Sequence, residues 1–187
     1  MKTKLVILVV TFLLLPATGC LWSLHPLYTA GDAVFEPGLV GVWAAADEGV
    51  VALVKESGGK SYEITYLENG SKKASPAQYV GRLVRLGDSL FLDLEAEEGA
   101  LERAGSDGVL ATHLIFRIRL QEDVLQVEMV DDELLKETDG SRLRHEKLPE
   151  RYLTLLTASP QEIRAWLAEH AQNPELYSDT LELRRVK

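Results

Sequence analysis

The amino-acid sequence predicts a mainly β fold, an antiparallel barrel or sandwich with one late amphipathic helix. Three observations lead to this prediction. Apolar and polar residues alternate along many short stretches, turn-forming residues separate those stretches, and clear helical periodicity occurs in one late segment. Short strands joined by tight turns favour an antiparallel sheet that curls on itself. We expect residues 39–187 to form a single β-rich domain.

The chain begins with the pattern of an export signal. Two lysines precede an apolar run over residues 5–15, and small residues lead from Pro16 into Cys20, the single cysteine of the chain. The run is about half the roughly 20 apolar residues that a membrane-spanning helix needs. This arrangement resembles the lipobox of bacterial lipoprotein precursors. The resemblance implies that Cys20 is lipidated on sulfur, that residues 1–19 are removed, and that the new amino terminus is acylated, for example with palmitate. A plain secretory signal that leaves Cys20 free is the alternative.

Residues 20–38 are expected to form the lipidated cysteine and a short tether. Proline and glycine punctuate this segment, which is too apolar for a freely solvated linker, so part of it should lie on the domain or near the membrane. The residues after the cysteine, Leu21 and Trp22, lack the aspartate of an inner-membrane retention signal. The expected location is therefore the cell envelope, on the periplasmic face of the outer membrane if the source is Gram-negative.

The composition narrows the classes of partner. Removal of 19 residues from 187 leaves 168, and removal of two lysines from 20 basic residues leaves 18 against 29 acidic ones, a formal charge of −11. Such an acidic chain is poorly suited to nucleic acid, whose affinity depends on Lys and Arg at phosphates. The same charge does not favour anionic lipid surfaces, so the acyl chains must supply the membrane attachment. A single cysteine also excludes an internal disulfide.

Alternation and turn residues predict where the strands lie. The expected strands are 39–46, 50–55, 61–68, 79–86, 90–95, 112–120, 124–130, 152–156 and 180–186. The expected turns are Asp47-Glu48-Gly49, Asn69-Gly70, Gly87-Asp88-Ser89 and Gln121-Glu122-Asp123. Asn69-Gly70 is the strongest hairpin signal because both residues tolerate a positive φ. Segment 96–108 predicts an exposed acidic loop, and segment 131–147 predicts a short helix at 132–137 followed by a loop.

The same alternation assigns apolar side chains to one face of each strand. These side chains are Tyr62, Ile64 and Tyr66; Leu90, Leu92 and Leu94; Leu114, Phe116, Ile118 and Leu120; and Leu125, Val127 and Met129. They should form the inside of the barrel or sandwich.

Segment 160–171 predicts the helix. Ser159 is a good N-cap, proline suits the first helical position, and Glu162 completes a capping box. The expected buried stripe comprises Ile163, Trp166, Leu167 and His170, of which the histidine should be partly buried and hydrogen-bonded.

Strand 39–46 carries Gly41-Val42-Trp43 shortly after Phe35-Glu36-Pro37. This motif resembles the G-x-W signature at the first strand of lipocalin-like barrels. The resemblance implies that Trp43 closes one barrel end and that a late arginine, Arg184 or Arg185, packs over it. A Trp43 that is simply a core aromatic is the alternative. Together with segment 24–29, the motif also resembles a group of bacterial lipoproteins.

Three basic residues, His113, Arg117 and Arg119, fall at even spacing along one strand, opposite its apolar face. If this face lined a barrel, the arginines could bind a phosphate or carboxylate through bidentate hydrogen bonds. If it faces water, they are solvated charges on an acidic surface. No metal or other cofactor is expected, because the four histidines are scattered and lack ligand spacing.

Gly87-Asp88-Ser89-Leu90 matches the block that holds the nucleophile in GDSL esterases and lipases. Those enzymes also need an Asp-x-x-His pair to activate the serine, and this sequence contains none. The sequence thus favours a non-enzymatic, membrane-anchored envelope lipoprotein that binds a protein partner or a small apolar ligand. A structural subunit of an envelope complex and a hydrolase that uses Ser89 are the alternatives. A cavity of several hundred Å³ would favour ligand binding.

Overall fold

The computed structural model describes residues 20–29, 31–68, 76–96, 111–132, 135, 143–148 and 153–187. The strands are β1 (Cys20–Ser23), β2 (Ala33–Val34), β3 (Gly41–Ala45), β4 (Val50–Glu56), β5 (Ser61–Glu68), β6 (Ala77–Leu86), β7 (Ser89–Ala96), β8 (His113–Gln121), β9 (Val124–Val130), β10 (His145–Leu148), β11 (Leu153–Leu156) and β12 (Tyr177–Arg185). The helices are α3 (Pro160–His170) and the 3-10 turns η1 (Pro37–Leu39), η2 (Ala46–Glu48) and η4 (Pro174–Leu176). The predicted fold class, mainly β with a late helix, is confirmed.

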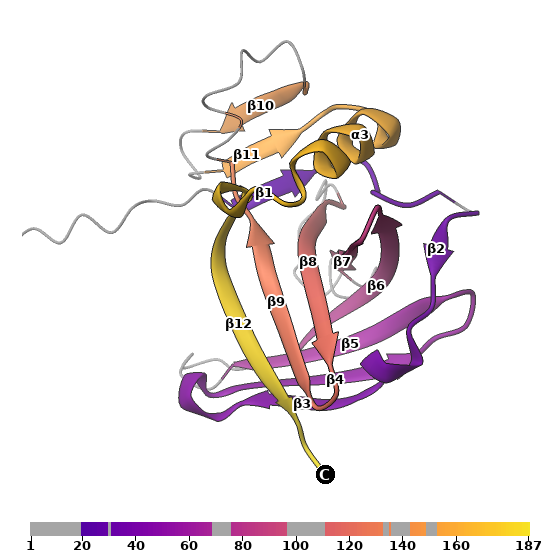
Figure 1. The fold of residues 1–187 in the computed structure, drawn as a ribbon, viewed down its shortest axis with the longest axis vertical. Coiled ribbons are helices and arrows are strands. Elements are labelled where there is room, and N and C mark those ends of the chain that lie inside the picture. The colour runs from indigo at the N-terminus through magenta and orange to yellow at the C-terminus, as the bar shows by residue number, and fades with distance from the viewer. Residues whose placement is uncertain are drawn as a thin grey trace, which may run out of the picture.

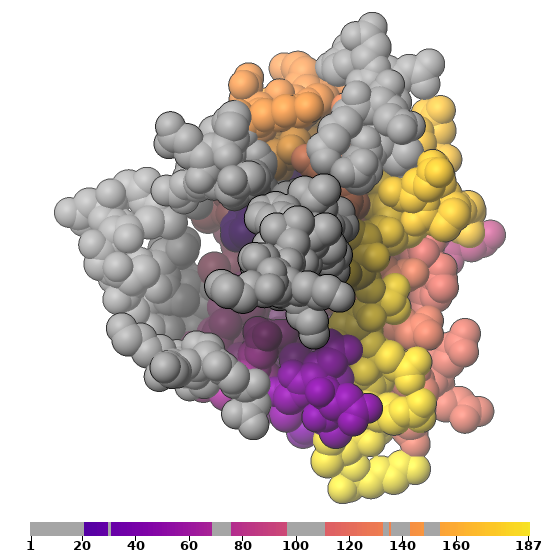
Figure 2. All heavy atoms as spheres, turned by 90° about the vertical axis from the view of Figure 1, so that its left-hand side faces the viewer, coloured from indigo at the N-terminus to yellow at the C-terminus, as the bar shows by residue number. Residues whose placement is uncertain are grey.

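Eight strands form a closed antiparallel barrel. Strands β3 to β9 follow one another around it, each paired with the next, and β12 completes the ring by pairing with both β9 and β3. In Figure 1 the barrel lies below, and β1, β10, β11 and α3 lie above it. Figure 2 shows the side where the ring closes, with the yellow of β12 between the purple of β3–β4 and the salmon of β9. The alternating pattern along each strand produces this closure, because one face of every barrel strand must be buried.

The barrel wall separates two hydrophobic cores. The inner core contains Trp43, Tyr62, Leu92 and Ile118 among its buried residues, and partly buried side chains such as Phe116 pack against it. This inner position confirms the predicted apolar faces of the strands. The second core lies on the outer side of the wall, where Val84, Phe91 and Ile115 meet Leu27 and the buried stripe of α3. At Phe91 of β7 and Ile115 of β8 the barrel wall is therefore covered on its outer face as well as on its inner face.

Residues 21–38, for which the sequence predicts a tether, are part of the fold. β1 pairs antiparallel with β8 and parallel with β11, and β2 pairs with β6. Leu21 and Leu27 are buried in the outer core. The chain thus enters the sheet at Cys20 itself, without a flexible spacer between that residue and the domain.

Helix α3 begins as predicted. Ser159 is the N-cap, and it forms the full capping box with Glu162. The Ser159 hydroxyl and backbone and the nearby Arg144 lower the pKa of Glu162 to about 2. The Trp166 ring is buried, and His170 stacks on it with ring centroids 4.7 Å apart. His170 Nδ1 lies 2.8 Å from the Trp166 carbonyl, so the prediction of a partly buried, hydrogen-bonded histidine is confirmed.

Trp43 lies in the inner core of the barrel. Its side chain is fully buried, and its indole N–H donates to the Leu39 carbonyl at 2.8 Å. The guanidinium carbon of Arg185 lies 4.3 Å from the centroid of the Trp43 ring. The expected late arginine over the tryptophan is therefore Arg185, whereas Arg184 pairs with the exposed Glu182.

Gly41 makes room for that arginine. Arg185 donates to the carbonyls of Val40, at 2.9 Å, and Gly38, so its guanidinium is fixed directly beside the backbone of β3. A Cβ atom at Gly41 would clash with this guanidinium, and the glycine has a φ of +150°. In the G-x-W motif, the glycine thus leaves space for the Arg185 guanidinium, and the tryptophan ring packs against that guanidinium.

Several predictions fall on parts of the chain outside the described residues. These parts are the signal segment 1–19, the turn Asn69-Gly70, the loop 97–108 and most of the expected helix 132–137. Within the described ranges, no helix is long and apolar enough to cross a membrane.

Candidate functional site: the barrel lumen and a charged groove

The inside of the barrel contains an apolar cavity of about 260 Å³. Its lining comes from seven barrel strands and η1, and includes Ile64 and Tyr66 of β5, Phe116 and Ile118 of β8, and Val127 of β9. Asp179 of β12 is its one charged lining residue among the described residues. Burial raises the pKa of the Tyr66 hydroxyl, and the charge of Glu68 raises it further, so this tyrosine is neutral. The residues predicted to face inward thus line a space that is slightly smaller than the roughly 300–1,000 Å³ typical of ligand pockets.

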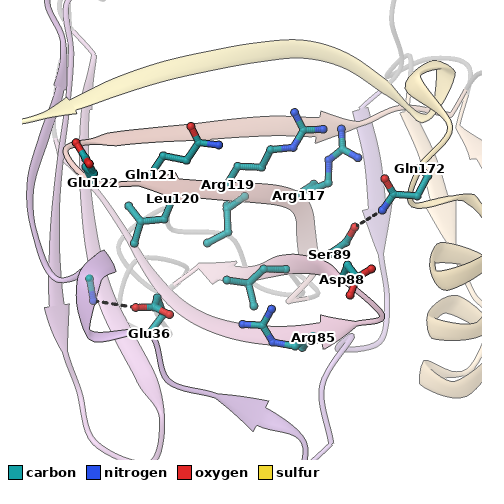
Figure 3. Close-up of a pocket in the computed structure, with 13 residues that line it drawn as sticks. Glu36, Arg85, Asp88, Ser89, Arg117, Arg119, Leu120, Gln121, Glu122 and Gln172 are labelled. Atoms are coloured by element: carbon teal, nitrogen blue, oxygen red, sulfur yellow. Dashed lines mark hydrogen bonds between the residues drawn. The ribbon is translucent and has the colours of Figure 1, made fainter.

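A second hollow, which we call the hairpin groove, lies where two hairpins diverge. The last pair between β7 and β8 is Leu90 with Ile118, whereas β8 continues to Gln121 in its hairpin with β9. The β8–β9 hairpin therefore extends beyond the β6–β7 hairpin and leaves a groove of about 660 Å³ (Figure 3). The lining residues are Glu36, Gly38, Arg85, Asp88, Ser89, Leu90, Arg117, Ile118, Arg119, Leu120, Gln121, Glu122 and Gln172.

Arg117 lies at one wall of the groove, but the chain itself occupies its guanidinium. Nε donates to Glu128 Oε2 at 2.6 Å and Nη2 to Glu128 Oε1 at 2.8 Å, a bidentate pair across β8 and β9. Nη1 donates to the carbonyl of Ala171, at the end of α3, at 2.6 Å. The ring of Tyr177 covers the guanidinium at 3.6 Å, and burial raises the pKa of this tyrosine to about 12. Arg117 is 5% exposed and ties the helix to the barrel.

Arg119, two residues further along β8, differs from Arg117. Its side chain is 49% exposed, and its Nε lies 3.6 Å from Glu128 Oε2, beyond hydrogen-bond distance. The alternative in which this face lines the barrel is therefore wrong, and the solvated alternative describes Arg119 but not the buried Arg117. The face lies on the outer side of the barrel. There α3 covers Arg117, whereas the guanidinium of Arg119 is partly exposed and makes no hydrogen bond to a described residue.

His113 is likewise buried by the chain rather than solvated. Its Nδ1 lies 2.7 Å from Asp93 Oδ1, and the other oxygen of Asp93 accepts the Leu27 N–H at 2.6 Å. Burial alone would lower the pKa of His113, but the hydrogen bond and charge of Asp93 outweigh it and leave the pKa above the usual value of 6.5. The edge of Tyr28 packs on the imidazole. This cluster fixes the N-terminal segment to the barrel and is separate from the groove.

Ser89 is buried at the start of β7, and its Oγ accepts a hydrogen bond from Gln172 Nε2 at 3.2 Å. Within the described part of the chain, none of its hydrogen bonds involves a histidine. The serine sits in a hairpin of an antiparallel barrel, so the surroundings differ from those of the GDSL enzymes. The described residues also contain no group of three or more side chains suited to hold a metal ion.

The two buried basic residues, His113 and Arg117, have the partners Asp93 and Glu128, which no motif in the sequence singles out. A signal for Glu128 existed. A two-residue turn at Glu122-Asp123 places Arg117 directly opposite Glu128, which is the observed register. Comparison of the chain with protein-family models, with curated proteins and with solved structures finds no match.

Proposed function

We propose that this protein is a non-enzymatic, lipid-anchored component of the bacterial cell envelope whose barrel binds a small apolar ligand in its lumen. The observation that carries the proposal is the apolar cavity of about 260 Å³ inside the barrel. A packed protein interior leaves few voids larger than a water molecule, so a space of this size inside the wall favours a ligand.

The lipobox-like sequence that ends at Cys20 supports the anchor. Because β1 begins at Cys20, acyl chains on that residue would hold the domain directly against the membrane surface. An apolar ligand that partitions into lipid would then be close to the barrel at all times.

A neutral fluorescent probe tests the lumen. We expect 1-aminoanthracene to bind the protein with a blue-shifted, enhanced emission, as it does in apolar surroundings. Val127→Phe places a large side chain in the cavity and should abolish the signal. Val51→Phe is the matched control, because Val51 lies on the outer face of β4 and is 37% exposed. Equal binding by both variants, with unchanged circular dichroism, would refute the lumen as the site.

A further inference from the structure

The charged side chains of the hairpin groove do not neutralise one another. Arg85 and Glu36 both line the groove, yet neither forms an ion pair with a described residue. The Glu36 carboxylate accepts one hydrogen bond, from the Gly38 N–H at 3.2 Å, and Arg119 approaches Glu128 only to 3.6 Å. Figure 3 shows Arg85 on the β6 side of the groove, Arg119 on the β8 side, and Glu36 toward one end. The groove thus offers free positive and negative groups at separate points.

A ligand whose charges all have the same sign does not match the charges of the hairpin groove. Glu128 already compensates Arg117, so the remaining charges are those of Arg85 and Arg119 against Glu36, Asp88 and Glu122. An anionic group would meet three carboxylates, and a cationic group would meet two guanidiniums. A head that carries both charges can place each one beside its opposite.

The floor of the groove is apolar and adjoins the lumen. It is formed by Leu90, Ile118 and Leu120, whose side chains belong to the inner face of the barrel. Ile118 lines both the groove and the lumen, and Gly38 in the groove directly precedes Leu39 in the lumen wall. The side chain of Ile118 therefore separates a charged space from an apolar one.

From this juxtaposition we infer that the ligand is an amphiphile with a zwitterionic head and a single hydrocarbon tail. The anionic part of the head lies at Arg85, the cationic part lies at Glu36, and the tail passes Ile118 into the lumen. The inference rests on the proposed binding of an apolar group in the lumen, and it adds the class of ligand and the residues that select it.

Four amphiphiles with the same decyl tail test the inference: decylphosphocholine, decyl phosphate, decylammonium and decanol. Each is titrated below its micelle concentration against bound 1-aminoanthracene. We expect decylphosphocholine to displace the probe about tenfold more tightly than decanol, the scale of a charge-assisted hydrogen bond. Arg85→Gln and Glu36→Gln should each bring decylphosphocholine close to decanol and leave decanol unchanged. Arg184→Gln, on the exposed outer face of β12, is the matched control and should change neither.

The outcomes separate the two proposals. If 1-aminoanthracene and decanol do not bind at all, the lumen proposal fails. If decanol displaces the probe and the four heads bind equally, the lumen proposal stands and the zwitterionic head is wrong. Tightest binding by decyl phosphate or by decylammonium would likewise overturn the zwitterionic assignment, as would binding of decylphosphocholine that leaves the probe in place.

Discussion

Replacement of Arg117 by methionine should strongly destabilise the protein. The substitution leaves the Glu128 carboxylate, 7% exposed, without its bidentate partner, and it removes one donor from the Ala171 carbonyl. Loss of one partner from a buried ion pair costs about 3–5 kcal/mol. Domains of this kind have a free energy of unfolding of about 5–15 kcal/mol, so the loss would be a large part of the total.

The measurement is urea unfolding followed by tryptophan fluorescence. With a slope of about 2 kcal/mol per M, the midpoint for Arg117→Met should fall by about 1.5–2.5 M. Arg119→Met is the matched control on the same strand. Its ion pair is long and half exposed, so its removal should cost less than about 1 kcal/mol.

The double variant Arg117→Met with Glu128→Met tests whether the loss of stability comes from the unpaired Glu128 carboxylate. Replacement of both members of a buried pair by apolar side chains is often nearly neutral, so this variant should be more stable than Arg117→Met alone. Equal, small losses for Arg117→Met and Arg119→Met would show that the buried pair does not form, and the account of how α3 is held would be wrong.

Three further predictions concern other parts of the fold. Gly41→Ala should displace the stacked arginine and cost about 1–3 kcal/mol in thermal or urea unfolding, whereas Gly31→Ala, with open space around its Cβ position, should cost little; equal effects would refute the role of Gly41. His113 has a folded-state pKa above its unfolded value, so its contribution to stability is complete below about pH 6.5 and is lost as pH rises through the folded pKa. The unfolding free energy lost in His113→Gln should therefore be larger at pH 5.5 than at pH 8.5, and a constant loss would contradict the Asp93 contact. Cys20→Ala should abolish lipid labelling and leave the precursor uncleaved in cells; normal processing of this variant would remove the anchor from the proposal.

Local pattern was sufficient for much of the fold. The inward faces of β5, β7, β8 and β9 follow from alternation, and the start of α3 follows from Ser159 and Glu162, because each depends on residues close in sequence. The closed ring and the position of Arg185 over Trp43 were accessible only through resemblance to a known motif, because the two residues are far apart in the chain.

The burial of the outer face of the barrel could not be predicted from local sequence pattern. His113 and Arg117 lie on a face that looks polar by alternation, and they become buried because segment 20–28 and α3 cover that face. The cover comes from both ends of the chain, and periodicity within β8 contains no information about it. The groove was missed for a related reason. It depends on the unequal reach of two hairpins, which follows from their register rather than from any motif.

The order of the strands has a consequence for how the protein folds. β12 follows α3 in the chain but pairs with β3, the first strand of the ring, so the contact between Trp43 and Arg185 joins two distant parts of the chain. Until β12 inserts, the edges of β3 and β9 expose unpaired backbone groups that can recruit strands from other molecules. Contacts of such long sequence separation also slow folding. An agent that shields strand edges during refolding should therefore increase the yield of the folded barrel.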